Sequence, residues 1–440
     1  MNTPIRFMES EGMNMDNVIK QNEPLKVPDG AFVLPDGKMV SMNERITMLN
    51  NNVIVCGTSG SLKTRNFIIP NLLEGVGSYI ITDPKGNLYN KYAGYLQKAK
   101  LYTVKRMSFI NPEQSIHYNP LAYIKTTLDI QKLVYNLIFS NKEDKIVPDP
   151  YWNNQSVFLM NSIFAYLYES KEDNPNNNNI PTAINLLRAC GRTDANTKSC
   201  KYLEIIKRHK ERYPDSWAYE QYMNVYTAPN KTYDTVVSNC LSKFSIYDTK
   251  EIRSMLSSND LVFSDIGRQK CALFIEISDT DKSMQPLINT LFTQAFNELC
   301  LYADSREDSR LPVPTRFFLD DFPSMKIPDF DIKSANIRSR KISVTIVIQS
   351  PSQLAGIYGE NSANTIIDNC DTLIFTGTNS PETAKAISLR ANKTPDTILH
   401  MPLGHSWIFR RGQMPYMCKN FNLDEWIEDN HRLFNVYKKI

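Results

Sequence analysis

The 440-residue chain lacks any apolar run long enough to cross a membrane. Its longest apolar runs, such as 53–56 and 67–69, are far shorter than the about 20 residues that a membrane helix needs. Residues 1–19 carry Glu9, Glu11 and Asp16 where a secretory signal would be apolar. We therefore expect neither a signal peptide nor a membrane span, and a cytoplasmic location.

Metal-binding patterns are also missing. The eight cysteines include no Cys-x-x-Cys pair and the five histidines show no metal-ligand spacing, so we expect buried free thiols in a reducing compartment. Lys and Arg number 50 against 47 Asp and Glu, a net charge of +3, so overall charge does not by itself indicate nucleic acid. With no internal repeat, the length suits two or three ordinary domains.

Short strand-like runs alternate with helical stretches over much of the chain, which is typical of a parallel α/β sheet. These runs are 53–56, 79–82, 102–109, 271–277, 313–319, 342–348, 372–375 and 407–409. Between 148 and 258 apolar residues instead recur at helical spacing, as Val157, Met160 and Phe164 do. The simplest architecture is one α/β domain interrupted by an all-helical unit.

The predicted domain limits follow from these changes of pattern. The domains are an N-terminal leader with one hairpin at 1–45, a nucleotide-binding domain in two parts at 46–147 and 259–440, and an inserted all-α domain at 148–258.

The first strand-like run leads into a sequence of the form G-x-x-x-x-G-K-[ST], except at one position, and a helix-compatible stretch, 65–73, follows. In this pattern successive backbone N–H groups surround a phosphate at the positive end of a helix. Lys63 would reach the β- and γ-phosphates of ATP, and Thr64 would bind Mg²⁺. The predicted nucleotide-binding residues are Gly57, Thr58, Ser59, Gly60, Ser61, Leu62, Lys63, Thr64 and Arg65.

Leu62 is the exception, because it stands where the pattern has glycine. Glycine there allows close approach to the phosphate and dihedral angles that a Cβ penalises. A chance Gly/Ser loop before a Lys-Thr helix is the alternative interpretation.

An apolar run at 315–319 ends in Asp320 and Asp321, as a Walker B strand requires. Asp320 would hold Mg²⁺ and Asp321 would orient the attacking water, although Glu is the more common residue at the second place. A polar turn after a core strand is the alternative.

Two further positions fit the same kind of site. The β-rich run 342–348 ends in Gln349, which suits the polar sensor that additional-strand P-loop ATPases carry between the phosphate loop and the acid strand. Arg338, just before that run, could act as an arginine finger on a neighbouring subunit's nucleotide. The alternatives are a solvent-facing glutamine and a solvated basic turn.

Taken together, these motifs resemble the type IV secretion coupling proteins, the conjugative DNA-transfer ATPases, and most closely their Gram-positive mobile-element branch. The similarity extends from about 50 to 410. It is carried by 57–65, Pro70-Asn71-Leu72, Thr82-Asp83-Pro84-Lys85-Gly86-Asn87-Leu88, Tyr118-Asn119-Pro120-Leu121, Leu319-Asp320-Asp321-Phe322, Ile337-Arg338-Ser339-Arg340, Ile348-Gln349-Ser350 and Asn369-Cys370-Asp371-Thr372.

The resemblance implies an α/β fold: a RecA-like P-loop ATPase domain with an inserted all-α domain. It also implies ATP and Mg²⁺ as cofactors and a homo-oligomer such as a hexamer. The implied partners are single-stranded DNA with its bound relaxase and the proteins of a type IV secretion channel. Most members have an N-terminal membrane anchor. Here we expect a separate anchor protein and a peripheral place at the cytoplasmic membrane, and the alternative is an anchor that lies outside this sequence.

Two alternatives to an ATP-driven motor stay open. Leu62 could leave a loop that binds nucleotide poorly, which would make the chain a receptor that recruits DNA and relaxase without hydrolysing ATP. A chromosomal or packaging translocase of the same fold is disfavoured, because the inserted helical domain and the 83–86 motif match the coupling family better.

Overall fold

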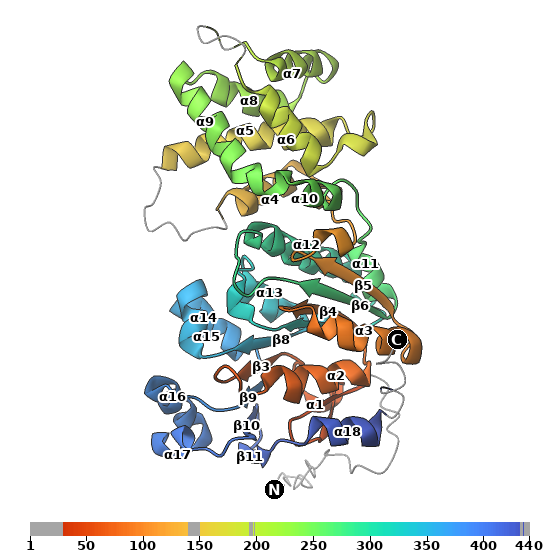
Figure 1. The fold of residues 1–440 in the computed structure, drawn as a ribbon, viewed down its shortest axis with the longest axis vertical. Coiled ribbons are helices and arrows are strands. Elements are labelled where there is room, and N and C mark those ends of the chain that lie inside the picture. Colours follow the sequence, from red (N-terminus) through yellow and green to blue (C-terminus); the bar gives the residue numbers. More distant parts are fainter. Residues whose placement is uncertain (1–29, 140–149, 193–196, 198, 432–433, 435–440) are drawn as a thin grey trace, which may run out of the picture.

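The computed structural model describes residues 30–139, 150–192, 197, 199–431 and 434. Within these residues one nine-stranded sheet has the order β11-β10-β9-β3-β8-β7-β4-β6-β5 (Figure 1). The strands from β9 to β5 in this order pair in parallel, and β10 pairs antiparallel with both of its neighbours, β9 and β11. Their bounds are β3 (Val53–Cys56), β4 (Ser78–Asp83), β5 (Thr103–Ser108), β6 (Cys271–Glu276), β7 (Thr315–Leu319), β8 (Ile342–Ile348), β9 (Thr372–Phe375), β10 (His405–Arg410) and β11 (Tyr416–Lys419).

Helices cover both faces of the sheet, which explains why its central strands are apolar throughout. Successive strand residues point to opposite faces, so Val53 and Val55 enter one core while Ile54 enters the other. The smaller core lies under α2 (Ile69–Glu74), α3 (Asn87–Ala99) and α18 (Leu423–Asn430). The larger core lies under α11 (Phe263–Arg268), α12 (Gln285–Asp304), α13 (Phe330–Asn336), α14 (Pro351–Tyr358), α15 (Glu360–Asp368), α16 (Pro381–Ala391) and α17 (Pro395–Leu399).

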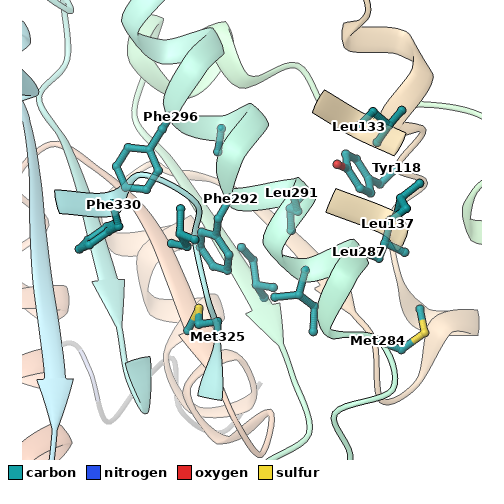
Figure 2. Packing of buried hydrophobic residues seen from close by; sticks show 14 of the residues in the cluster. Tyr118, Leu133, Leu137, Met284, Leu287, Leu291, Phe292, Phe296, Met325 and Phe330 are labelled. Atoms are coloured by element: carbon teal, nitrogen blue, oxygen red, sulfur yellow. The ribbon is translucent and has the colours of Figure 1, made fainter. Parts of the chain in front are cut away.

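Helix α12 joins the larger core to the helical part of the chain. The ring of Phe296 meets Phe330 edge-on at 5.9 Å, and further along α12 Leu287 lies beside Leu137 of α4 (Thr127–Phe139) (Figure 2). Beside and beyond α4 stand the other helices between β5 and β6 in sequence, apart from α11, which lies against the sheet (Figure 1). They are α5 (Pro150–Glu169), α6 (Ile180–Ala189), α7 (Lys201–Arg212), α8 (Trp217–Tyr226), α9 (Asn230–Phe244) and α10 (Lys250–Met255).

A hairpin precedes the sheet and is attached to α2. It comprises β1 (Ala31–Val33) and β2 (Met39–Ser41), and the short helix α1 (Glu44–Thr47) follows it. The buried Asn71 of α2 bonds Val33 twice: its Oδ1 accepts from the Val33 N–H at 3.0 Å, and its Nδ2 donates to the Val33 carbonyl at 2.9 Å. The same Nδ2 donates to the Phe67 carbonyl at 2.8 Å. One side chain therefore joins the hairpin to the helix behind the phosphate loop.

Each of the eight strand-like runs coincides with a strand, and β3, β8 and β9 match to the residue. Strand β11 was not predicted, because it is a short edge strand whose residues are partly exposed. The hairpin expected before residue 45 is present, and residues 1–29 of that leader lie outside the described residues. Within the described ranges every helix is too short or too polar to cross a bilayer.

The helix predicted at 65–73 begins differently. A π-helical turn, Thr64–Ile68, comes first, and in it the Ile69 N–H donates to the Thr64 carbonyl. Pro70 lacks the N–H that a regular α-helix needs at that point, and its ring crowds the carbonyl of Asn66 four residues earlier. Single π turns of this kind are frequent at functional sites.

Candidate nucleotide-binding site

The sequence-predicted motifs, apart from Arg338, meet at one edge of the sheet. Strands β3, β8, β7 and β4 are parallel neighbours in that order, so their carboxyl ends and the loops that follow share an edge. Ligands of open α/β sheets bind at this edge. Strand β8, which ends at Gln349, lies between the phosphate-loop strand and the acid strand, as the additional-strand interpretation requires.

The phosphate loop keeps a glycine-type shape at the position that lacks glycine. Leu62 has φ +61°, in the left-handed region, and Gly60 has φ +78°. For an ordinary residue this conformation costs about 1–2 kcal/mol. The Leu62 carbonyl accepts from the Asn66 N–H at 2.8 Å, and the Leu62 side chain is about half exposed. The departure from the pattern therefore places a strained backbone in the loop.

Lys63 lies inside the loop. Its Nζ donates to the carbonyls of Gly57 and Thr58, both at 2.7 Å. Burial lowers the pKa of Lys63, and the nearby Asp320 carboxylate acts in the opposite direction. An ammonium held by two loop carbonyls lies where a P-loop lysine meets phosphate oxygens.

Thr64 and Asp320 are in contact. The Thr64 Oγ1 donates to Asp320 Oδ2 at 2.5 Å, which joins the helix after the loop to the end of β7. Burial raises the pKa of Asp320. A hydroxyl beside a carboxylate is an oxygen donor pair that suits Mg²⁺, and a cation between them would favour the ionised Asp320. The two predicted metal ligands therefore fit the ion.

Asp321 turns away from the strand in a left-handed conformation, with φ +52°. Its N–H donates to Asp320 Oδ1 at 3.1 Å. Burial raises the pKa of Asp321, and the neighbouring Asp279 raises it further. Aspartate tolerates positive φ better than most residues. This backbone offers a physical reason for Asp where related sites more often carry Glu.

Asp83 ends β4 but points to the start of α3. Its Oδ2 accepts from the Tyr89 N–H at 2.8 Å, and burial raises its pKa. Next to it, at the end of β6, Glu276 is 1% exposed and bonds Arg106 through both oxygens, at 2.8 and 3.0 Å. A Cβ on Gly86 would lie 3.0 Å from Glu276 Oε1. Asp83 and Glu276 therefore shape the loop beside the predicted metal ligands.

Gln349 and Arg338 occupy opposite ends of β8. Gln349 is exposed at the nucleotide edge, where its backbone N–H donates to Gln353 Oε1 at 3.1 Å. Arg338 precedes the strand and forms an ion pair with Glu44 at 3.6 Å. Seven strand residues at about 3.3 Å each separate them. Arg338 therefore lies across the sheet from its own chain's phosphate loop and could act on a nucleotide only in another subunit.

A cavity of about 310 Å³ opens beside Thr64 and Asp320. Its wall carries Arg65, Lys85 and Lys91. The Arg65 guanidinium also bonds Asp424 of α18 at 2.7 Å. The sequence-based prediction did not include α18 beside the site, since no motif marks that helix.

Thr376, which follows β9, also escaped prediction. It contacts the phosphate loop from the side away from β8. Thr376 could have been predicted, because it follows the predicted strand 372–375 and polar residues at the carboxyl ends of parallel strands often form sites.

Comparison with known proteins identifies the family. A model described as type IV secretory system conjugative DNA transfer matches residues 5–394. The type IV secretion system-coupling protein VirD4 of Bartonella henselae is 20% identical over 357 residues, which cover 78% of this chain and 53% of that protein. Protein VirD4 of Agrobacterium fabrum is 22% identical over 332 residues, covering 73% and 46%. The chain thus spans about half the length of the curated relatives it matches.

Solved structures show the same fold. The bacterial conjugative coupling protein TrwBdeltaN70, in complex with sulphate, aligns with a TM-score of 0.64 and 14% identity over 89% of each chain. TrwB in complex with ADP and Mg²⁺ aligns with a TM-score of 0.62 and 14% identity, again over 89% of each chain. Both share the α/β sheet with a helical insertion. The chain belongs to the type IV secretory system conjugative DNA transfer family.

Proposed function

We propose that the chain is the coupling ATPase of a conjugative type IV secretion system, which drives relaxase-bound single-stranded DNA to the transfer channel by hydrolysing ATP. The contact of Thr64 with Asp320, beside the partly buried Lys63, carries this proposal, because it joins a phosphate loop to an acid strand as ATP hydrolysis requires. Family membership supports the DNA-transfer part. The relative TrwB, captured with ADP and Mg²⁺, supports the choice of cofactors.

Each predicted residue has a role in this proposal. Lys63 and the loop N–H groups at 57–65 bind the phosphates, while Thr64 and Asp320 hold Mg²⁺, which neutralises charge on the phosphate oxygens. Asp321 orients the attacking water, and Gln349 bonds the γ-phosphate or that water. Arg338 is supplied by a neighbouring subunit, since it lies far from the loop of its own chain.

The proposed partners follow from the family. They are a relaxase on single-stranded DNA, the channel proteins and a separate membrane anchor protein, with this chain at the cytoplasmic face of the membrane as a hexamer. We also propose that the chain belongs to the Gram-positive mobile-element branch of the family, and that its inserted all-α domain spans 148–258. On its outermost helix, α7, Lys201, Lys207 and Arg208 are exposed and suit contact with DNA or relaxase.

A receptor that does not hydrolyse ATP is the second candidate. The left-handed Leu62 favours it, because a Cβ and a branched side chain stand where the pattern has none. Such a chain would recruit the same DNA and relaxase and leave transport to another motor.

ATP hydrolysis by the purified chain tests the proposal. We expect turnover that requires Mg²⁺ and increases with single-stranded DNA, because DNA assembles the subunits that exchange Arg338. The absence of both nucleotide binding and turnover, measured with DNA present, would contradict the motor and favour the receptor.

Leu62→Gly separates the two candidates. Because Leu62 already has the glycine-type conformation, the motor predicts that ATP turnover changes by less than about threefold. The receptor predicts turnover that the natural chain lacks. Steady-state ATPase rates of both chains decide between them, and Gly60→Ala, at a neighbouring positive φ, is the matched control that should lower activity in the motor.

A further inference from the structure

Two hydroxyl side chains support the phosphate loop from the end of β9, and we call them the brace: Thr376, which follows β9, and Ser61 in the loop. Thr376 Oγ1 lies 2.7 Å from Ser61 Oγ, and Ser61 Oγ donates to the Thr58 carbonyl at 2.7 Å. Each hydroxyl has one hydrogen: Ser61 gives its own to the Thr58 carbonyl, and Ser61 Oγ at 2.7 Å is a closer acceptor for Thr376 than the Cys56 carbonyl at 3.3 Å, so we take Thr376 as the donor of the first bond. The result is a chain of hydrogen bonds from Thr376 through Ser61 to Thr58, and hydroxyl bonds in series strengthen each other.

This series of hydrogen bonds ends at the Thr58 carbonyl oxygen, which also accepts a bond from Lys63. The Thr58 carbonyl accepts from Lys63 Nζ at 2.7 Å, as well as from Ser61. The Thr58 N–H in turn donates to the Gly377 carbonyl at 3.2 Å. Thr376 is thus three hydrogen bonds from the lysine that meets the phosphate, although it is more than 300 positions later in sequence.

The fit between loop and brace is close. A Cβ on Gly57 would lie 1.9 Å from Thr376 Oγ1 and 2.8 Å from Ser61 Oγ. The Thr376 N–H and Oγ1 also approach the Cys56 carbonyl, at 2.9 and 3.3 Å. Gly57 therefore allows the loop to lie directly against Thr376.

The strained backbone of Leu62 is the reason that the phosphate loop needs this support. A strained residue persists only where its surroundings determine its conformation, and Ser61 directly precedes Leu62. If Ser61 is released, the backbone at 62 is free to relax to negative φ and carry Lys63 out of place. We propose that Thr376 is a positioning residue that, through Ser61, holds the phosphate loop in its binding shape in spite of Leu62. This inference rests on the proposed nucleotide site and names a residue beyond it.

Four chains test the coupling: wild type, Thr376→Val, Leu62→Gly and the double variant. With a fluorescent ATP analogue, we expect Thr376→Val to weaken binding about fivefold in the Leu62 background and less than about twofold with glycine at 62, since glycine accepts the loop shape unaided. KM should rise with little change in kcat, because chemistry follows once the loop is filled. Equal losses in both backgrounds, or none, would overturn the inference.

Control variants separate the brace from general damage. Thr376→Ser keeps the hydroxyl and should bind like wild type, whereas Ser61→Ala breaks the same chain and should resemble Thr376→Val. Thr378→Val removes a buried hydroxyl that bonds the Ser380 N–H, and should leave affinity unchanged. Hydrogen exchange without nucleotide gives an independent readout: amides at 57–64 should exchange faster in Thr376→Val than in Thr376→Ser. Failure of the wild type to bind ATP would contradict the proposed function, while unchanged exchange would contradict the brace.

Discussion

Lys63→Ala should lower Mg²⁺-dependent ATP turnover by at least about a hundredfold, because the variant loses the one ammonium that the loop directs at the phosphates. Conjugative DNA transfer in donor cells carrying the variant should fall in parallel. Steady-state phosphate release and transfer frequency are the two measurements. Turnover or transfer near the wild-type level would contradict the motor.

Two controls accompany this result. The fold should be intact in Lys63→Ala, since the two carbonyls that lose the ammonium belong to the phosphate loop, whose next residues Ser59 and Gly60 are exposed, and to none of the helices or strands. Circular dichroism and an unchanged unfolding temperature would show it. Lys63→Arg keeps the charge, yet its planar fork does not match a site built for a point charge, so activity should remain low. Recovery by arginine would mean that charge alone suffices.

Arg106→Met should lower the free energy of unfolding by about 3 kcal/mol. Glu276 is buried and bonds Arg106 through both of its oxygens, so losing the guanidinium leaves an uncompensated carboxylate inside the protein. The arginine also lies over the Tyr89 ring, at 4.8 Å, and methionine keeps much of that apolar contact. Urea unfolding monitored by circular dichroism measures the change.

An exposed ion pair provides the matched comparison. Arg65→Met breaks the bond to Asp424, where both side chains are exposed, and should cost less than about 1 kcal/mol. Adding Glu276→Leu to Arg106→Met removes the stranded charge and should recover most of the loss. If Arg106→Met costs no more than Arg65→Met, the buried pair does not stabilise the fold in the way its burial indicates.

The sheet could be predicted because its central strands are continuous apolar runs. Val53–Cys56, Ile342–Ile348 and Thr372–Phe375 are covered on both faces, so their limits coincide with the limits of apolar sequence. Parallel strands place their carboxyl ends together, and for that reason Lys63, Asp320 and Gln349 could be assigned to one site, since the motif of each follows a predicted strand.

Other features depend on contacts that no local pattern records. The partner of Arg338 is Glu44, nearly 300 residues away in sequence, and Asp83 bonds the backbone of α3. Leu62 could be recognised as unusual, but its φ of +61° results from the loop around it. The antiparallel edge was missed for a similar reason. An apolar run such as His405–Arg410 does not reveal strand direction, and here β10 pairs antiparallel with both β9 and β11.

Asn71 has a mechanical consequence. Its amide bonds both the N–H and the carbonyl of Val33, so β1 and α2 move together as a stiff unit. A tensile load on the chain at Gly30 reaches Val33 within three residues and passes through that amide to α2, directly behind the turn that begins at Thr64. Force on the chain ahead of the hairpin is therefore transmitted directly to α2, the helix that follows the phosphate loop.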